Sequence, residues 1–396
     1  MKTVTAVLHR LTLIFILVCM LVLVAAESVG QEDDARRSSD GAVYVMTNQA
    51  SGNTIVAYHR SHDGTLTHRR EFSTGGLGSG PILFLPPPIG GPNPLDSQDS
   101  LLLAENGHLL LAVNAGSNDV SVLAISDEGL RLIDKVPSGG DFPVSIAMYH
   151  RLVYVLNSHG TPNMTGFFLT SSGRLRAIPR STRSAGTPGT APAQVMFSPD
   201  GDALLVTERL ANFISVFRVL ENGRTELRDR FASNNHTPFA STLGHHGLVA
   251  LSESNESIPR IAVPNGGSVS TYRFTEEGSL VPISRAIPTQ QGGTCWVRIT
   301  PNGRFAYAAN TGSGSISSYF VSPHGELSLL ASRATDTGGP FSVPIDIGIT
   351  GDGKFLYVLS SLIGTVKGFR IENDGSLTPV TSVDGFPISM QGIVVR

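Results

Sequence analysis

Cysteine is almost absent from this sequence of 396 residues, which contains only Cys19 and Cys295. Cys19 lies in an N-terminal apolar segment that we expect to be removed, so no disulfide can form within the remaining chain. Cys295 lies in the apolar run TCWVRI, which favours a buried, unreactive thiol over a nucleophile. The fold therefore has to be stabilised without disulfides.

Charged residues are also few, at 15% of the chain. Without residues 1–26, 27 basic residues face 32 acidic ones, which gives a net charge of −5. No basic stripe is present, and this argues against a nucleic-acid partner. The 43 glycines, 24 prolines and 40% hydrophobic residues are typical of a turn-rich β protein with a sizeable core.

The first 26 residues differ from the rest of the chain. Lys2 and Arg10 precede an apolar run over residues 11–26 that ends in small residues, which is the pattern of a secretory signal peptide. An uncleaved membrane anchor is the alternative, but the run is short for a span of about 20 residues. We expect cleavage after Ala26, a secreted, extracellular protein without membrane attachment, and a disordered leader over the charged, Ser-rich residues 27–40.

Three Asn-X-Ser/Thr sequences begin at Asn163, Asn235 and Asn255. We expect all three in surface loops, where N-glycosylation acceptors belong, so the secreted protein would be a glycoprotein in a host that glycosylates.

The most informative feature of the sequence is a unit that recurs about every 50 residues and closes on a glycine followed by leucine. In each unit, short runs with period-two alternation, such as FAYAAN and GSISSY, are separated by Asp-Gly, Asn-Gly or similar turns. Such runs predict antiparallel strands joined by tight hairpins. Seven copies, each of four strands, predict an all-β seven-bladed β-propeller over residues 41–396.

Two segments depart from the repeat. The first unit lacks its inner strand, while residues 386–396 (FPISMQGIVVR) resemble an inner strand with no other strands after it. The C-terminal strand should therefore complete the first blade and hide the edges of the sheet. Residues 75–99 are rich in Gly and Pro, and we expect them to form a loop insertion over one face.

In a propeller the inner strands converge on a central funnel, and a pocket is expected at its mouth. The loops between the second and third strands supply His159, Glu208 and Arg209 as a candidate acid/base set with a carboxylate-binding guanidinium. In the alternative, Glu208 stabilises a tight turn. The starts of inner strands supply candidate substrate contacts: Asp99, Gln194, Trp296 and Asp346. No motif for a metal or another cofactor is present, so we expect neither.

The repeated PDG/PNG, FAYAAN, GSISSY and DGxL elements over residues 41–396 resemble the seven-bladed propeller lactonases, a family that includes bacterial-type 6-phosphogluconolactonases and fungal carboxymuconate-lactonising enzymes. The resemblance implies a lactone hydrolase or cycloisomerase acting on a small carboxylated molecule. We expect the protein to be a monomer. Residues 190–194 (TAPAQ) lack the Arg and His of the family's Gly-Pro-Arg-His stretch. A non-catalytic extracellular propeller that binds a glycan or a protein is therefore the alternative.

Secretion gives the first testable prediction. Mass spectrometry of protein recovered from the medium of expressing cells should find an N-terminus at or after Glu27, because the signal peptide ends at Ala26. Recovery of the full-length chain in the membrane fraction alone would contradict it.

Overall fold

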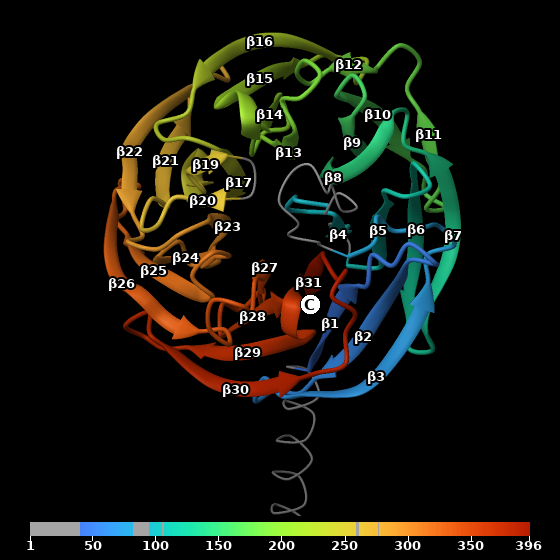
Figure 1. Ribbon diagram of the computed structural model, residues 1–396. Helices are drawn as coiled ribbons and strands as arrows, with labels where there is room; N and C mark the ends of the chain where they lie inside the picture. The colour runs from blue at the N-terminus through green and yellow to red at the C-terminus, as the bar shows by residue number, and fades with distance from the viewer. Residues whose placement is uncertain (1–39, 82–94, 105–106, 259–260, 276) are drawn as a thin grey trace, which may run out of the picture.

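The computed structural model describes residues 40–81, 95–104, 107–258, 261–275 and 277–396. Figure 1 shows seven antiparallel sheets arranged as a ring around a central axis. The predicted seven-bladed β-propeller is therefore confirmed. The predicted signal peptide, nearly all of the leader and residues 82–94 of the loop insertion lie outside the described residues.

The first four blades follow one another along the chain. Blade 1 contains β1 (Gly41–Met46), β2 (Thr54–Arg60), β3 (Leu66–Ser73) and β31 (Ile393–Val395); blade 2 contains β4 (Leu101–Leu103), β5 (Leu109–Asn114), β6 (Asp119–Ser126) and β7 (Gly129–Pro137). Blade 3 contains β8 (Asp141–Tyr149), β9 (Leu152–His159), β10 (Asn163–Leu169), β11 (Leu175–Ala177) and the short β12 (Arg183–Ser184); blade 4 contains β13 (Pro192–Phe197), β14 (Ala203–Glu208), β15 (Phe213–Val219) and β16 (Thr225–Ala232).

The last three blades repeat this order. Blade 5 contains β17 (Pro238–Leu243), β18 (Leu248–Glu253), β21 (Ser268–Phe274) and β22 (Leu280–Pro288), with an extra hairpin of β19 (Glu256–Ile258) and β20 (Ile261–Ala262). Blade 6 contains β23 (Thr294–Ile299), β24 (Phe305–Asn310), β25 (Ser315–Val321) and β26 (Leu327–Asp336); blade 7 contains β27 (Pro344–Ile349), β28 (Phe355–Ser360), β29 (Thr365–Ile371) and β30 (Leu377–Val383).

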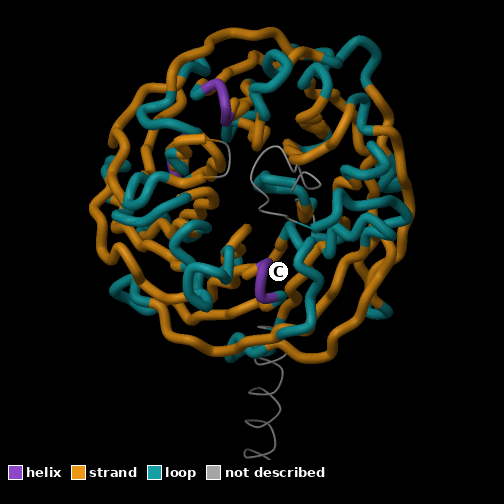
Figure 2. The backbone as a smooth tube through the Cα atoms, in the orientation of Figure 1, coloured by secondary structure: helices purple, strands orange, loops and turns teal. Residues whose placement is uncertain are grey.

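Helix is limited, over the described residues, to three short 3-10 turns: η1 (Arg209–Ala211), η2 (His245–Gly247) and η3 (Ser361–Ile363). Figure 2 shows them as brief interruptions in a chain of strands and loops. In this part of the chain no helix has the length and apolar character needed to cross a membrane.

Contacts between neighbouring blades explain why the unit repeats. The buried Tyr154, Tyr307 and Tyr357 lie in the second strands of blades 3, 6 and 7, and each donates its hydroxyl to a glycine carbonyl of the next blade. The acceptors are Gly223 (2.6 Å), Gly375 (3.0 Å) and Gly64 (2.7 Å). These glycines have φ between 72° and 89°, which disfavours other residues. The glycine that closes each of these repeats is thus a docking point for the preceding blade.

The ring is closed by strands from the two ends of the chain. β31 pairs with β1 in the register Val43↔Val395, Tyr44↔Val394 and Val45↔Ile393. Figure 1 shows the C-terminus beside β1. The prediction that the last strand completes blade 1 is confirmed.

Removing residues 386–396 should therefore open the ring. The deletion exposes the edge of β1 and loses Phe386, Met390 and Ile393, which are all buried. Burial of each apolar side chain of this size contributes about 1.5–3 kcal/mol to the free energy of unfolding. The free energy of unfolding of a whole protein is only about 5–15 kcal/mol. We expect an insoluble chain, or a melting temperature more than about 10 °C lower.

Two point variants provide a milder, matched test. Ile393→Ala, where the side chain is 2% exposed, should reduce the free energy of unfolding by about 2–5 kcal/mol. Ile388→Ala, at 40% exposure, should change it little. Equal unfolding curves for both variants would argue against closure by this strand.

Candidate functional site

The centre of the ring is occupied by residues 95–100, which we call the axial segment. Ser97 donates its hydroxyl to the carbonyl of Val144 in blade 3 (2.6 Å). The Ser97 carbonyl accepts hydrogen bonds from Trp296 Nε1 in blade 6 and Gln391 Nε2 next to β31, both at 2.9 Å. Gln98 Nε2 donates to the Ser241 carbonyl in blade 5 (2.7 Å). One short segment thus connects inner strands from several sides of the ring.

Three of the four predicted substrate contacts meet at the axis around Arg298, a residue that the sequence analysis missed. Arg298 Nη2 lies 2.7 Å from Asp99 Oδ1 and 4.0 Å from Asp346 Oδ1. Gln194 Nε2 donates to Asp99 Oδ2 (2.6 Å). Burial alone would lower the pKa of Arg298, but the two carboxylates raise it, so the guanidinium remains charged. We call these four residues the axial cluster.

The polar side chains of the axial cluster also hold consecutive blades together. The pairing of the first two strands shifts register in blades 3 to 7, and a β-bulge of this kind leaves backbone groups without a ladder partner. Gln194 Oε1 accepts the N–H of Ser241 in the next blade, and Asp346 Oδ2 accepts the N–H of Ile393 in β31 (3.1 Å). These bonds to neighbouring strands explain why Gln194 and Asp346 lie at the axis, and a substrate contact is not needed to explain it.

A separate cavity of about 340 Å³ lies at the mouth of the funnel, over blades 4 to 7. This volume is within the range of roughly 300–1,000 Å³ that is common for small-molecule sites. Its walls come from the loops and inner-strand ends that the sequence analysis assigned to the mouth. The lining includes Asp96, Arg209, Phe239, Glu256, Cys295, Trp296, Thr311, Phe341 and Leu362. We call it the mouth cavity.

Among the residues that the structure describes, Arg209 is the one cation that lines the cavity. It is buried, its Nη1 lies 3.0 Å from Asp96 Oδ2, and its guanidinium lies 5.5 Å from the centre of the Phe239 ring. Burial alone would lower the pKa of Arg209, but Asp96 and Glu256 raise it, which keeps it charged. Its Nε–H is buried without a hydrogen-bond partner in the structure. Because buried donors are almost always satisfied, this N–H is available to a ligand oxygen.

Glu256 brings a second carboxylate to the mouth cavity. It begins β19 in the extra hairpin of blade 5, is partly exposed, and accepts a hydrogen bond from Ser254 Oγ (3.1 Å). Thr311, from the loop after β24, uses its hydroxyl to bond the Pro344 carbonyl (3.0 Å). Cys295 is buried as predicted, and burial raises the pKa of its thiol, so it remains protonated. The cavity therefore joins a hydrogen-bond donor, a carboxylate and aromatic walls.

Glu208 does not line the cavity, which corrects the predicted catalytic set. Its Oε1 accepts the Ser215 hydroxyl (2.6 Å), and Arg230 contacts both carboxylate oxygens at 2.9 and 2.8 Å. Similar bonds, also between residues seven apart, join strands in blades 2 and 6: Asn114 to Ser121 and Asn310 to Ser317. Glu208 thus holds the second and third strands of blade 4 together.

His159 is also outside the lining of the mouth cavity. Its ring stacks on Phe142 within blade 3, with centroids 3.8 Å apart and 16° between the planes. Of the three predicted catalytic residues, Arg209 alone lines the cavity, so the expected shared site is not formed. Trp296, predicted to contact substrate, lines the cavity, and its ring centroid lies 4.8 Å from that of Phe239. Its contact with a substrate stays a prediction.

Three residues of the sites escaped the sequence analysis for different reasons. Arg298 stands two residues after Trp296 in one strand, so alternation would have placed both on the same face. Glu256 lies in a loop longer than its counterparts in other blades. Asp96 meets Arg209 across 113 residues, and no local pattern encodes that pairing.

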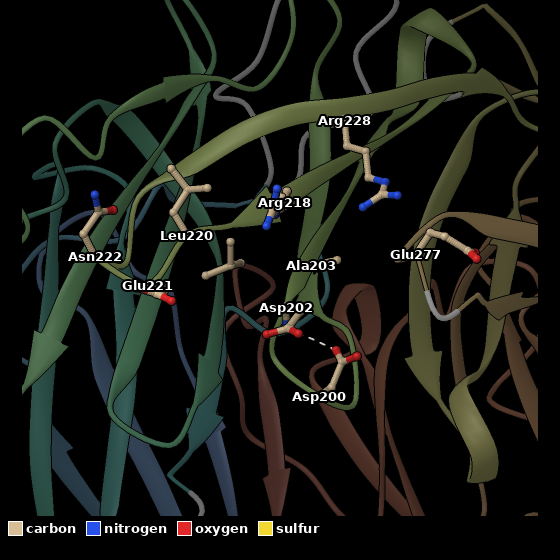
Figure 3. Close-up of a pocket in the computed structure, with 11 residues that line it drawn as sticks. Asp200, Asp202, Ala203, Arg218, Leu220, Glu221, Asn222, Arg228 and Glu277 are labelled. Atoms are coloured by element: carbon tan, nitrogen blue, oxygen red, sulfur yellow. Dashed lines mark hydrogen bonds between the residues drawn. The ribbon is translucent and has the colours of Figure 1, made fainter.

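Other hollows are less suited to chemistry. A hollow of about 920 Å³ lies between blades 4 and 5; Figure 3 shows Asp200 and Asp202 on the β13–β14 turn, with Arg218, Arg228 and Glu277 around them. None of its lining residues is aromatic, and Asp200 bonds Ser198 and the Asp202 amide within its own turn. It therefore resembles a solvated groove between hairpins.

The remaining expectations from the sequence concern metal binding and the three N-glycosylation sequences. Within the described part of the chain, no group of three His, Cys, Asp or Glu side chains is arranged to hold a metal. Asn235 and Asn255 lie in loops and both donate Nδ2 to the Gly266 carbonyl (3.1 Å). Asn163 is the first residue of β10, so the expectation of a loop is wrong there.

Asp346 makes the stability depend on pH. Burial raises the pKa of Asp346 to about 7, against the attraction of Arg298, while an unfolded Asp titrates near 3.8. Between these values the folded state holds a proton that the unfolded state has lost, so stability falls as pH rises from about 4 to 7. In Asp346→Asn the free energy of unfolding should no longer fall with pH, a slope of roughly 1.4 kcal/mol per pH unit in the wild type. The variant also loses one hydrogen bond, which lowers its stability equally at every pH.

Urea unfolding at pH 5, 6 and 7 measures the slope. Asp374→Asn is the matched control, because the Ser376 hydroxyl and amide lower the pKa of Asp374 and confine its effect to acidic pH. Parallel pH profiles for the wild type and Asp346→Asn would show that Asp346 does not titrate in this range.

Comparison with known proteins agrees with the fold. Residues 255–389 match the family model of the lactonase seven-bladed β-propellers, and no curated protein matches the sequence. The periplasmic gluconolactonase of Pseudomonas aeruginosa has a similar structure (TM-score 0.69, 16% identity, covering 90% of this chain and 99% of that one). A protein from Lactobacillus plantarum gives the same values.

A provisionally assigned 6-phosphogluconolactonase from Bacteroides uniformis is similar as well (TM-score 0.66, 20% identity, covering 89% of this chain and 99% of that one). Identities this low establish the fold rather than a shared reaction. The resemblance predicted from the repeats is nevertheless confirmed: this chain is a seven-bladed β-propeller, and its residues 255–389 match the lactonase family model.

Proposed function

We propose that the protein is an exported lactone hydrolase whose active site is the mouth cavity. The observation that carries the proposal is the unpartnered Nε–H of the buried Arg209 in the wall of that cavity. A fixed donor in a dry wall stabilises negative charge as it develops on a carbonyl oxygen. The family model also spans much of the cavity, including Glu256, Trp296 and Phe341.

The residues present are sufficient for hydrolysis. Glu256 takes a proton from water, and the water oxygen bonds to the lactone carbonyl carbon while Arg209 Nε–H donates to the carbonyl oxygen. The ring C–O bond then breaks, and the proton passes from Glu256 to the departing ring oxygen. The product is the open hydroxy acid, and the same groups catalyse ring closure in reverse.

Export is part of the proposal. It is supported by the signal-peptide pattern of residues 1–26 and by the similar fold of a gluconolactonase that is periplasmic. The protein would then meet its substrate outside the cytoplasm, where no intracellular cofactor supply is available. A mechanism that uses only side chains and water suits that location.

The test is lactone hydrolysis by the purified chain from Glu27 onward, followed by pH-stat titration. Glu256→Gln should reduce kcat by about 10²–10⁴-fold because it removes the base. Arg209→Lys keeps a positive charge for Asp96 but lacks Nε–H, so it should reduce kcat by about 10²–10³-fold. Thermal melting checks that each variant is folded.

Glu208→Gln is the matched control. Its carboxylate serves Ser215 and Arg230 outside the cavity, so this variant should melt at a lower temperature yet keep its turnover per folded molecule. Glu256→Gln with unchanged turnover would rule out the proposed base. Binding of a glycan or protein at the mouth with no lactone turned over would instead support a non-catalytic binding propeller.

A further inference from the structure

The cation of the mouth cavity is already paired. Among the described lining residues the positive charge belongs to Arg209, and its Nη1 lies 3.0 Å from Asp96 Oδ2. A carboxylate or phosphate ligand would have to compete with Asp96 for this guanidinium, and the Asp96 carboxylate would repel it.

The free donor of Arg209 also suits a single oxygen. Anionic groups are typically recognised by two parallel N–H donors of one guanidinium. Here Nη1 is directed to Asp96, and Nε–H is the buried donor without a partner. One donor can satisfy the carbonyl oxygen of a neutral ester, whereas a phosphate would leave most of its acceptor capacity unused in a partly dry site.

The remaining walls are apolar and extend to the rim. Phe239 and Trp296 line the interior, and Val343, Ile345 and Leu362 continue the surface. Phe341 stands at the edge with 80% of its surface exposed. Leu210 and Ile363, which follow the lining residues Arg209 and Leu362 in the sequence, are exposed as well. Such a rim can bury an apolar substituent that projects from a bound ring.

We infer that the substrate is an uncharged lactone bearing an apolar substituent, with its ring carbonyl at Arg209 Nε–H and its substituent along Trp296 and Phe341. This inference rests on the proposed function and departs from the carboxylated ligand expected from the sequence. Hydrolysis converts the neutral ring into a hydroxy acid that ionises to a carboxylate. Repulsion from the Asp96 carboxylate in the cavity wall then favours release of that product.

The first experiment compares four δ-lactones by pH-stat: an alkyl-substituted lactone (δ-nonalactone), unsubstituted δ-valerolactone, the polyhydroxylated glucono-δ-lactone and its 6-phosphate. We expect kcat/KM to be highest for δ-nonalactone, about 10- to 200-fold above δ-valerolactone because of a few buried methylene groups, and lowest for the phosphate. A higher kcat/KM for glucono-δ-lactone or its phosphate would overturn this inference while leaving the lactonase proposal intact.

Binding without turnover separates the two proposals. The matching alkyl δ-lactam keeps the ring carbonyl but resists hydrolysis, and its binding can be followed by calorimetry. Lactam binding with no lactone hydrolysed would refute the hydrolase and yet support a neutral apolar ligand. Absence of both lactam binding and hydrolysis would overturn both.

Variants of the rim and of the ion pair test the geometry. Phe341→Ser should reduce kcat/KM for δ-nonalactone about tenfold and leave δ-valerolactone unchanged. Phe168→Ser, at a phenylalanine 44% exposed in β10 and outside the cavity lining, should affect neither. Asp96→Asn releases the charge of Arg209 and should increase affinity for the 6-phosphate. Equal effects of the two phenylalanine variants would overturn the assignment of the rim, even if Asp96→Asn does not fold.

Discussion

Two ion pairs made by one short segment, Asp96 with Arg209 and Asp99 with Arg298, are the interactions on which the centre of this propeller depends. Both arginines are largely removed from water, and removing the partner of a buried charge costs about 3–5 kcal/mol. Together the axial segment and Arg298, which donates to the Ile347 carbonyl (3.1 Å), bond to residues from every blade. The axis is thus filled by polar groups that satisfy one another, and the strands around it are held from inside as well as by the closing pair β1 and β31.

The fold could be predicted from the sequence because its determinants are local and repeated. Alternation gives each strand its buried face. The glycine that closes a repeat adopts a positive φ, and in three repeats its carbonyl also accepts a tyrosine hydroxyl of the preceding blade. The closing strand was readable because residues 386–396 have an inner-strand pattern and the first unit lacks that strand. The strands and turns need at most one repeat of context, and the closing strand needs only a comparison of the first and last repeats.

The site was harder to predict because its contacts break the repeat. Glu208 attracted attention as a carboxylate beside Arg209, but the hydroxyl of Ser215 seven residues later matches the spacing of Asn114 with Ser121 and of Asn310 with Ser317. That spacing, available in the sequence, marks Glu208 as structural. Asp96 had no such marker, since its partner Arg209 lies 113 residues away, with blades 2 and 3 between them. Local patterns therefore predict the scaffold, whereas the position of the catalytic candidates depends on contacts between distant parts of the chain.

The axial segment links the mouth cavity to the axial cluster, and this link affects which ligands the cavity can bind. Asp96 borders the mouth cavity, and Asp99, three residues along the same segment, belongs to the axial cluster. A guanidinium has five N–H donors, so a neutral carbonyl can take the free Nε–H while Asp96 keeps Nη1. An anion strong enough to displace Asp96 would separate that carboxylate from Arg209 and would disturb the segment that joins the blades. The pairing that holds this segment in place thus competes with an anionic ligand for Arg209, which supports the proposal of a neutral ligand.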